Sequence, residues 1–358
     1  MSYVTPSKVF AHLDRLHAWK VGAKPAPVTL EWDLSNRCVL GCQDCHFAHT
    51  HTRGPWVTKD RRLPMAFDAC GDLADGHVVR RALREAKLSG VEGVIWTGGG
   101  EPTTHPQWAE IVAYTASQGL RQGMYTLGGL LTADSGALLA RCADWVVVSL
   151  DAPDAETYGR EKGVPAERFE AACAGIRHLV AEPRSGCAVG VSFLLHGGNW
   201  HRAAEMLRLA RELRATYATF RPAIRTSPDR PADCDDDRRW VTEAMPTLEW
   251  LAAEEDVVCD PPRFAAYRDW AGRDYDTCHG IKMSATVTPD GRMWVCPQKR
   301  GVRDALLGDL TTEPFSEIWA RHPGKWTDFS QCRVMCRLHL VNQQLAPVFA
   351  DYAHAAFV

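Results

Sequence analysis

Short apolar runs that alternate with amphipathic helical stretches constrain the fold of this chain more than any other feature. Six runs have the length and composition of strands, at residues 28–32, 93–97, 122–126, 145–149, 189–195 and 217–221. Helical periodicity fills the intervals between them, at residues 77–88, 108–118, 132–142, 166–181 and 200–214. A helix after each strand predicts a parallel sheet with right-handed crossovers. We therefore expect an α/β fold, a partial (β/α)6 TIM-like barrel, whose functional loops follow the carboxyl ends of the strands.

The composition fits one barrel with an appended domain. The chain has 358 residues, of which 46% are hydrophobic, and 41 basic against 44 acidic residues give a net charge of −3. This balance favours neither nucleic acid nor a membrane surface as a partner. The start lacks a basic region followed by an apolar one, and no apolar run approaches the ~18 residues of a membrane span. We expect a cytoplasmic protein, whose 13 cysteines are metal ligands or free thiols rather than disulfides.

Five consecutive parts are expected along the chain. They are an N-terminal helical extension (1–27), the barrel (28–225), a linker or substrate-covering segment (226–275), a small C-terminal hairpin-plus-helix domain (276–345) and a tail (346–358). The polar, proline-containing stretch 226–239 suggests the linker. Two apolar runs, 283–288 and 292–296, flank a Pro-Asp-Gly turn and predict the hairpin.

Three cysteines follow the first strand with the spacing C-x3-C-x2-C: Cys38, Cys42 and Cys45. Three neighbouring thiolates bind a soft metal centre well. On a four-iron cluster they would leave one iron open for an exogenous ligand, whereas a closed zinc site requires a fourth protein ligand. A zinc site that recruits His46 or His49 is the alternative.

A glycine-rich turn follows the second strand, with Gly99, Gly100, Glu101 and Pro102 in succession. Glycines at the end of a strand let a ligand approach the backbone, where free N–H and C=O groups can hold a zwitterion. Glu101 could instead act as the N-terminal acid of a helix. Taken alone, such a turn is also typical of phosphate-binding loops.

These two motifs, together with Ser149 and Asp151 after the fourth strand, resemble the radical S-adenosylmethionine (radical SAM) superfamily over residues 28–222. The resemblance implies that Cys38, Cys42 and Cys45 hold a 4Fe–4S cluster whose open iron chelates the amino and carboxylate groups of SAM. It implies that one electron from the cluster cleaves SAM to methionine and a 5′-deoxyadenosyl radical, which abstracts a substrate hydrogen.

The same resemblance assigns further residues to SAM. The turn at 99–102 would sit against the methionine amine, and Ser149 and Asp151 would approach the carboxylate or ribose. The residue before the third cysteine, often aromatic in the family, is Asp44 here, which leaves Phe47 to cover the adenine unless it belongs to the core. Lys162 stands where relatives often place an arginine that pairs with the SAM carboxylate. A solvated lysine in an Arg-Glu-Lys run is the alternative.

A second set of cysteines lies in the C-terminal part: Cys278, Cys296, Cys332 and Cys336. Their arrangement resembles the auxiliary-cluster extensions called SPASM and Twitch, which implies a second 4Fe–4S cluster within residues 276–345. The full SPASM pattern has about seven cysteines and two clusters, so four positions fit the shorter, single-cluster Twitch form better. A structural zinc site is the alternative.

We therefore expect a radical SAM enzyme of oxidoreductase type, reduced by a donor such as flavodoxin or ferredoxin. Its auxiliary cluster would take an electron during net oxidation or rearrangement of a small molecule (a sugar, aminocyclitol or nucleoside) in natural-product biosynthesis. One alternative is a maturase of a peptide or protein, although residues 1–28 are too short for a peptide-recognition domain. The other is a zinc-stabilised, non-catalytic binding protein. Candidates for a base, which the sequence does not rank, are Arg221, His196 and Glu156.

Overall fold

The central feature is one curved sheet of ten strands, in the order β12-β11-β10-β1-β4-β5-β6-β7-β8-β9. The computed structural model describes residues 6–42, 45, 52–53, 70–182, 186–224, 238–329, 332 and 335–352. The six predicted barrel strands are all present, as β1 (Thr29–Asp33), β4 (Gly93–Thr97), β5 (Arg121–Thr126), β6 (Trp145–Val148), β7 (Ala188–Leu195) and β8 (Tyr217–Pro222). They pair in parallel with their neighbours, which confirms the α/β, partial-barrel prediction.

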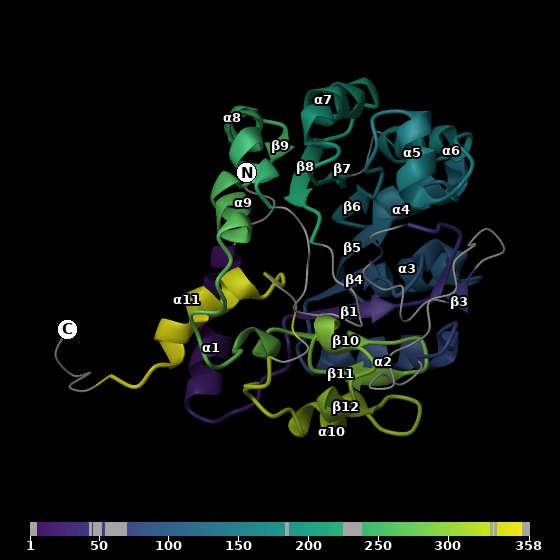
Figure 1. Ribbon diagram of the computed structural model, residues 1–358. Coiled ribbons are helices and arrows are strands. Elements are labelled where there is room, and N and C mark those ends of the chain that lie inside the picture. Colours follow the sequence, from purple (N-terminus) through teal and green to yellow (C-terminus); the bar gives the residue numbers. More distant parts are fainter. Residues whose placement is uncertain are drawn as a thin grey trace.

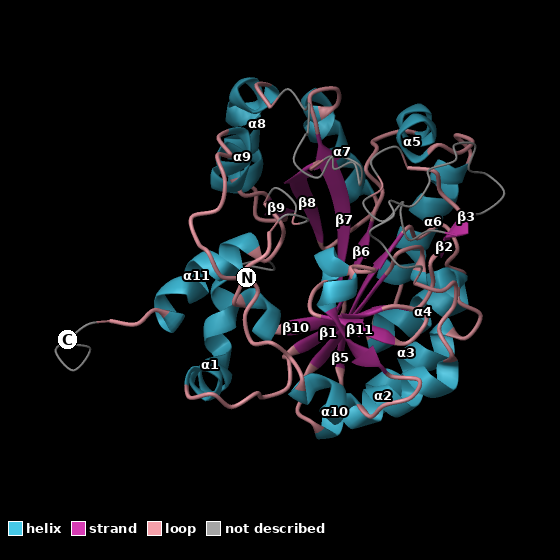
Figure 2. Ribbon diagram, turned by 60° about the horizontal axis from the view of Figure 1, so that its bottom comes forward, coloured by secondary structure: helices cyan, strands magenta, loops and turns pink. Residues whose placement is uncertain are grey.

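The crossover helices lie on the outer side of this sheet (Figure 2). The five that the sequence predicts are α2 (Gly76–Leu88), α3 (Trp108–Ser117), α4 (Ala133–Cys142), α6 (Arg168–Val180) and α7 (Ala203–Glu212). A further helix, α5 (Ala155–Lys162), precedes α6. Asp154 caps its first turn by accepting a hydrogen bond from the Thr157 N–H at 2.8 Å, and Gly163 ends it in a left-handed conformation.

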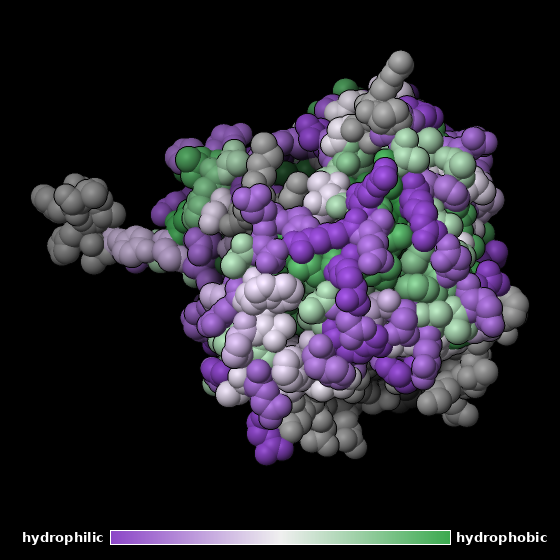
Figure 3. All heavy atoms as spheres, turned by 90° about the horizontal axis from the view of Figure 1, so that it is seen from above, coloured by the Kyte–Doolittle hydropathy of each residue, from purple (hydrophilic) through white to green (hydrophobic). Residues whose placement is uncertain are grey.

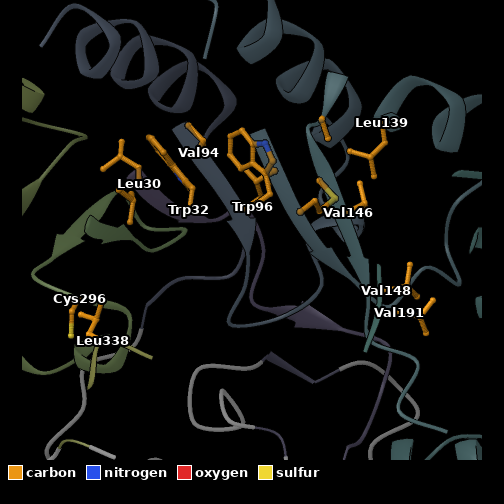
Figure 4. Close-up of a cluster of buried hydrophobic side chains, with 14 of the residues drawn as sticks. Leu30, Trp32, Val94, Trp96, Leu139, Val146, Val148, Val191, Cys296 and Leu338 are labelled. Carbon is orange, nitrogen blue, oxygen red and sulfur yellow. The ribbon is translucent and has the colours of Figure 1, made fainter. Parts of the chain in front are cut away.

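Successive side chains of each strand point alternately to the helix-covered core and to the barrel interior. On β1, Leu30 and Trp32 are buried under the helices, while Glu31, between them, faces the interior. Trp32 packs near Trp96 of β4, with ring centroids 6.5 Å apart (Figure 4). The Trp96 Nε1–H donates to Gln122 Oε1 at 2.7 Å, so the buried indole is satisfied.

The region 226–275, predicted as a linker, is largely structured in its described part. It holds α8 (Trp240–Ala253), β9 (Val257–Val258), which pairs in parallel with β8, and α9 (Pro261–Arg268). Leu248 of α8 and Phe264 of α9 are buried in the main core. The linker prediction rests on the polar stretch at the start of this region, and it overlooks the apolar residues of the helices that follow. Residues 225–237 lie outside the described residues.

The predicted hairpin is present as β10 (Ser284–Val287) and β11 (Arg292–Trp294), which are antiparallel. Unexpectedly, β10 pairs in parallel with β1, so the C-terminal strands extend the barrel sheet instead of forming a separate one. Antiparallel β12 (Leu306–Asp309) completes that edge. Figure 1 shows these strands beside β1.

Helices and short elements complete the described chain. The helices are α1 (Leu13–Lys20), α10 (Phe315–Ala320) and α11 (His339–Phe349), with β2 (Arg37–Cys38) and β3 (Thr52–Arg53) forming a small separate sheet. Short 3-10 turns are η1 (Pro6–His12), η2 (Pro102–Thr104), η3 (Trp200–Arg202), η4 (Gly280–Lys282), η5 (Pro297–Lys299) and η6 (Arg303–Ala305). Within the described residues, no helix has the length and apolarity needed to cross a membrane. Residues 350–352, which follow α11, extend away from the rest of the described chain (Figure 1). Seen from above, hydrophilic side chains surround a hydrophobic area of the surface (Figure 3).

Candidate active site

A cavity of about 430 Å³ opens at the carboxyl ends of the barrel strands. It brings together residues that are far apart in the sequence, as expected where parallel strands end at one edge. Nine of the predicted site residues line it: Cys38, Cys42, Cys45, Gly99, Gly100, Glu101, Ser149, Lys162 and, from the second cysteine set, Cys336. Pro102 is buried and begins η2 without lining the cavity, and Phe47 lies outside the described residues.

The cysteine loop is attached to the end of α5. The Gly41 N–H donates to the Lys162 carbonyl at 2.8 Å. Gly163 has a φ of +63°, and a Cβ there would lie 2.6 Å from the Gly41 carbonyl oxygen, so the close approach requires glycine. Within the loop, the Cys45 N–H donates to the Cys42 carbonyl at 3.4 Å. The end of α5, which the sequence analysis does not predict, therefore holds the loop backbone at Gly41, between Cys38 and Cys42.

Three thiols beside one cavity suit an iron–sulfur cluster. Within the described residues, no three His, Cys, Asp or Glu side chains converge as they would around one metal ion. A four-iron cluster attaches each cysteine to a different iron, so its ligands need not converge on one point. Burial raises the pKa of the Cys38 thiol, and the neighbouring Cys42 raises it further, so a cationic centre would favour the thiolate form of Cys38. The histidines of the zinc alternative, His46 and His49, lie outside the described residues.

The glycine turn packs tightly against the start of the cysteine loop. A Cβ at Gly100 would lie 2.2 Å from the Arg37 carbonyl oxygen, so no larger residue fits there. The Gly100 N–H donates to the Ser35 carbonyl at 3.0 Å, and the Glu101 N–H donates to the Arg37 carbonyl at 2.8 Å. The Gly99 backbone N–H donates to the buried Asp33 carboxylate. The turn thus holds the cysteine loop to β1.

Glu101 is buried and surrounded by hydrogen-bond donors. Its Oε1 accepts from the hydroxyls of Thr103 and Thr126, each at 2.6 Å, and its Oε2 accepts from the Leu127 N–H at 2.8 Å. Burial raises the pKa of this carboxyl, while the hydrogen bonds act to lower it. Glu101 caps η2, as the sequence alternative predicts, and ties the turn after β4 to the end of β5. Its contact with the SAM amine stays a prediction.

Lys162 forms a buried ion pair with Asp151. The Lys162 Nζ donates to Asp151 Oδ2 at 2.6 Å, and Asp151 Oδ1 accepts from the Ser192 hydroxyl and the Leu194 N–H, each at 3.0 Å. Lys162 is 6% exposed, so the alternative of a solvated lysine is wrong. Burial acts to lower the pKa of Lys162, but Asp151 and Cys42 together raise it above its ordinary value. Asp151 does not itself line the cavity, so it acts there through the ammonium that it orients.

The second cysteine set lines a smaller cavity next to the first. All four predicted ligands contribute: Cys278, Cys296, Cys332 and Cys336. Cys336 and Gln298 line both cavities and therefore form the wall between them. The Asn342 Nδ2 donates to Cys278 Sγ at 3.1 Å, and the Cys278 N–H donates to the Trp326 carbonyl at 2.7 Å. Cys278 and Cys296 are buried, and Cys332 and Cys336 are half-buried. Four thiols around one space suit a fully ligated cluster.

Three arginines that line the main cavity were not assigned to SAM or to a metal by the sequence analysis: Arg221, Arg263 and Arg337. The position of Arg221 at the end of a predicted strand and that of Arg337 beside a predicted ligand could have signalled the site. Arg263 belongs to α9, which is not predicted. Of the three candidate bases, only Arg221 lines the cavity, and a guanidinium does not deprotonate in proteins. None of the three candidates therefore acts as a base among the described residues that line the cavity.

Comparison with known proteins agrees with this geometry. Residues 32–210, half of the chain, match the radical SAM superfamily, and the chain belongs to that superfamily. Residues 278–338 match the iron-sulfur cluster-binding domain SPASM, so this is a radical SAM protein with a SPASM domain. The cofactors of these domains are SAM and 4Fe–4S clusters. The single-cluster form favoured by the cysteine count stays a prediction.

Similar proteins differ in what they make. The AdoMet-dependent heme synthase of Methanosarcina barkeri is 26% identical, over 82% of this chain and 82% of its own length. The PqqA peptide cyclase of Methylorubrum populi is 28% identical, over 84% of this chain and 73% of its own length. Among solved structures, SuiB of Streptococcus suis has a TM-score of 0.62 at 15% identity, over 84% of this chain and 67% of SuiB. SuiB bound to its precursor peptide SuiA has a TM-score of 0.59 at 16% identity, over 90% of this chain and 71% of SuiB.

Proposed function

We propose that this radical SAM enzyme modifies a peptide, which would bind in the main cavity between the two sets of cysteines. The observation that carries the proposal is the shared wall of Cys336 and Gln298, which brings the auxiliary site to the edge of the cavity that the first three cysteines line. The similarity to the PqqA peptide cyclase, and the fold shared with SuiB, support a peptide in preference to a sugar, aminocyclitol or nucleoside.

The first cluster would be held by Cys38, Cys42 and Cys45, and the auxiliary cluster by Cys278, Cys296, Cys332 and Cys336. When bound, the first cluster and SAM supply reductive cleavage of SAM and abstraction of one hydrogen atom from a substrate carbon. The residues of the chain bind and orient these groups. Lys162, held by Asp151, presents an ammonium to the SAM carboxylate, and the glycine turn presents backbone groups to its amine.

The apolar part of the cavity would hold the substrate and exclude water from the reacting carbon. Leu40 and Met335 line it beside the two cysteine sets, and Leu194 and Ile224 line it at the ends of β7 and β8. Exclusion of water protects a reactive species from side reactions. An oxidative outcome, with an electron passing to the auxiliary cluster, is the finer part of this proposal, and flavodoxin or ferredoxin is the proposed class of reductant.

Deuterium transfer tests the proposal. The anaerobically purified, reduced holoenzyme is incubated with SAM and with deuterated synthetic peptides translated from short reading frames beside its gene. We expect deuterium in 5′-deoxyadenosine and a mass change in one peptide. Deuterium transfer only from non-peptide metabolites would contradict the peptide assignment. In that case the similarity to a heme synthase, which makes a small molecule, would favour the second candidate, a small-molecule substrate.

A further inference from the structure

The main cavity carries an excess of positive charge that its own acids do not neutralise. Four cationic side chains line it, against two carboxylates, Glu31 and Glu101. Glu101 accepts only from neutral donors. Lys162 is paired with Asp151 at 2.6 Å, and Arg337 is paired with the buried Glu31. Among the described residues, no carboxylate is paired with either Arg221 or Arg263. Within the part of the chain that the structure describes, these two guanidiniums therefore lack a paired counter-ion.

Arg221 is held at the end of β8 by neutral groups. Its Nε–H donates to the Thr219 hydroxyl at 3.4 Å, and its guanidinium carbon lies 5.8 Å from the centroid of the Tyr125 ring. Asp151 acts on Arg221 through its charge, but it is paired with Lys162 and not with Arg221. The contacts with Thr219 and Tyr125 orient the Arg221 side chain without neutralising its charge. A guanidinium held in this way can bind an anionic ligand.

Arg263 reaches the same cavity from α9, on the side of the auxiliary cysteines. Its Nε is buried and has no hydrogen-bond partner among the described residues. Burial lowers the pKa of Arg263, and the positive charge of Arg221 lowers it further, so the two guanidiniums act on each other. Asp260, exposed at the start of α9, acts on Arg263 through its charge but is not paired with it. A buried donor without an acceptor costs free energy that a bound acceptor recovers.

We propose that Arg221 and Arg263 together bind a carboxylate of the substrate, and thereby place its reacting carbon between the two cysteine sets. This inference rests on the proposed function and defines its substrate class: a peptide with an acidic side chain or a free C-terminus at the modified position. A carboxylate matches the planar, forked donors of a guanidinium, and two forks on one carboxylate fix its direction as well as its charge.

Three small peptide analogues, two anionic and one neutral, distinguish a side-chain carboxylate from a C-terminal one. N-acetylglutamate α-amide carries it on the side chain, N-acetylglutamine carries it at the C-terminus, and N-acetylglutamine α-amide carries none. Binding of radiolabelled probes to the anaerobic holoenzyme saturated with SAM is measured by equilibrium dialysis. We expect at least one anionic probe to bind about tenfold or more tightly than the neutral probe, as charged hydrogen bonds allow.

Variants locate that preference. Arg263→Gln and Arg221→Gln should each remove it, and Arg263→Lys should retain part of it because the charge remains while the fork is lost. Arg208→Gln, which changes an exposed arginine of α7, should retain it in full. The thermal unfolding midpoint of each variant serves as a check on its folding.

Several results would overturn the carboxylate site. They are equal binding of all three probes, no binding of any probe, a preference that survives both glutamine substitutions, or a loss of SAM affinity in these variants with the probe preference unchanged. The last would assign the arginines to the SAM carboxylate. Cleavage of SAM by the wild-type protein is measured in parallel. Its absence would contradict the proposed function itself and is thus distinguishable from failure of the carboxylate site.

Discussion

At the scale of single residues, the site is organised by buried polar groups whose partners come from the chain itself. Glu101 satisfies donors from η2 and β5, and Asp151 satisfies donors from β7 as well as Lys162. Such buried groups position their neighbours because leaving a donor unpaired costs roughly 1–3 kcal/mol. The three cysteines, the glycine turn and Lys162 thus depend on residues that need not touch a cofactor.

Glu101→Gln tests this positioning role. The amide keeps the size of the side chain but must direct an N–H₂ group at a backbone donor, either the Leu127 N–H or the Thr103 N–H. We expect the free energy of unfolding to fall by about 1–3 kcal/mol. Denaturant unfolding of the anaerobic holoprotein measures it. An unchanged midpoint would mean that the carboxylate does not hold the two strand ends together.

His322 gives the chain a pH dependence. It is fully buried, it stacks on Trp319 with centroids 4.4 Å apart, and its Nδ1 accepts from the Gly324 N–H at 3.1 Å. Burial and the charges of Lys282 and Lys24 lower its pKa to about 3. The unfolded chain binds this proton at a higher pH, so the stability is complete above the ordinary pKa of 6.5 and is lost as the pH falls towards 3.

The corresponding variant is His322→Phe, which keeps an aromatic ring and removes the titrating group. Below the unfolded pKa, the wild-type unfolding free energy should fall by up to about 1.4 kcal/mol per pH unit from this residue. His279, whose burial lowers its pKa to about 4, adds to the same trend. Between pH 6.5 and pH 5.0, the denaturant midpoint should fall further in the wild type than in His322→Phe. Equal slopes for both proteins would show that His322 does not carry the effect.

At the scale of elements, the sequence predicts the strands and helices whose apolar residues recur at a regular spacing. The six barrel strands and five crossover helices follow from apolar patterns, and the hairpin follows from its Asp-Gly turn. Helix α5 escapes prediction because it is short and polar, and α9 because a polar region precedes it. These two elements carry Lys162 and Arg263, so the sequence alone cannot show that these side chains face the cavity. The parallel pairing of β10 with β1 is a non-local contact that no local pattern encodes.

The attachment of the cysteine loop to α5 is testable at Gly163. Gly163→Ala places a β-carbon in a left-handed position and against the Gly41 carbonyl oxygen. Gly22→Ala is a matched control, because Gly22 also has a positive φ, of +89°, with no atom within 4 Å of a Cβ. Both should lose about 1 kcal/mol of stability from backbone strain.

Only Gly163→Ala should also impair the cluster site. We expect a lower iron content and slower SAM cleavage in this variant, measured by iron analysis and by formation of 5′-deoxyadenosine. Equal iron content and equal SAM cleavage in the two variants would show that α5 does not position the loop.

At the scale of the whole molecule, one continuous sheet joins the barrel to the C-terminal strands. The two cavities are neighbours and share the lining residues Cys336 and Gln298. This continuity places the auxiliary cysteines beside the main cavity. If the auxiliary cluster serves only to accept an electron late in the reaction, it acts after SAM has been cleaved. The two cysteine sets should therefore differ in what their loss prevents.

Cys296→Ala removes a buried cysteine that lines the auxiliary site and is a predicted ligand of its cluster. We expect it to lower product formation much more than it lowers formation of 5′-deoxyadenosine, with both measured on the same anaerobic sample. Cys42→Ala is the matched variant in the first set and should abolish both. An equal loss of SAM cleavage in the two variants would assign the auxiliary site a structural role.

The central claim is that Cys38, Cys42 and Cys45 leave one cluster position open, at which SAM binds and is cleaved. The most direct measurement is formation of methionine and 5′-deoxyadenosine by the anaerobically reconstituted, reduced protein. The account predicts equal amounts of both products from the wild type and none from Cys42→Ala. An iron-loaded wild-type protein that neither binds nor cleaves SAM would contradict it.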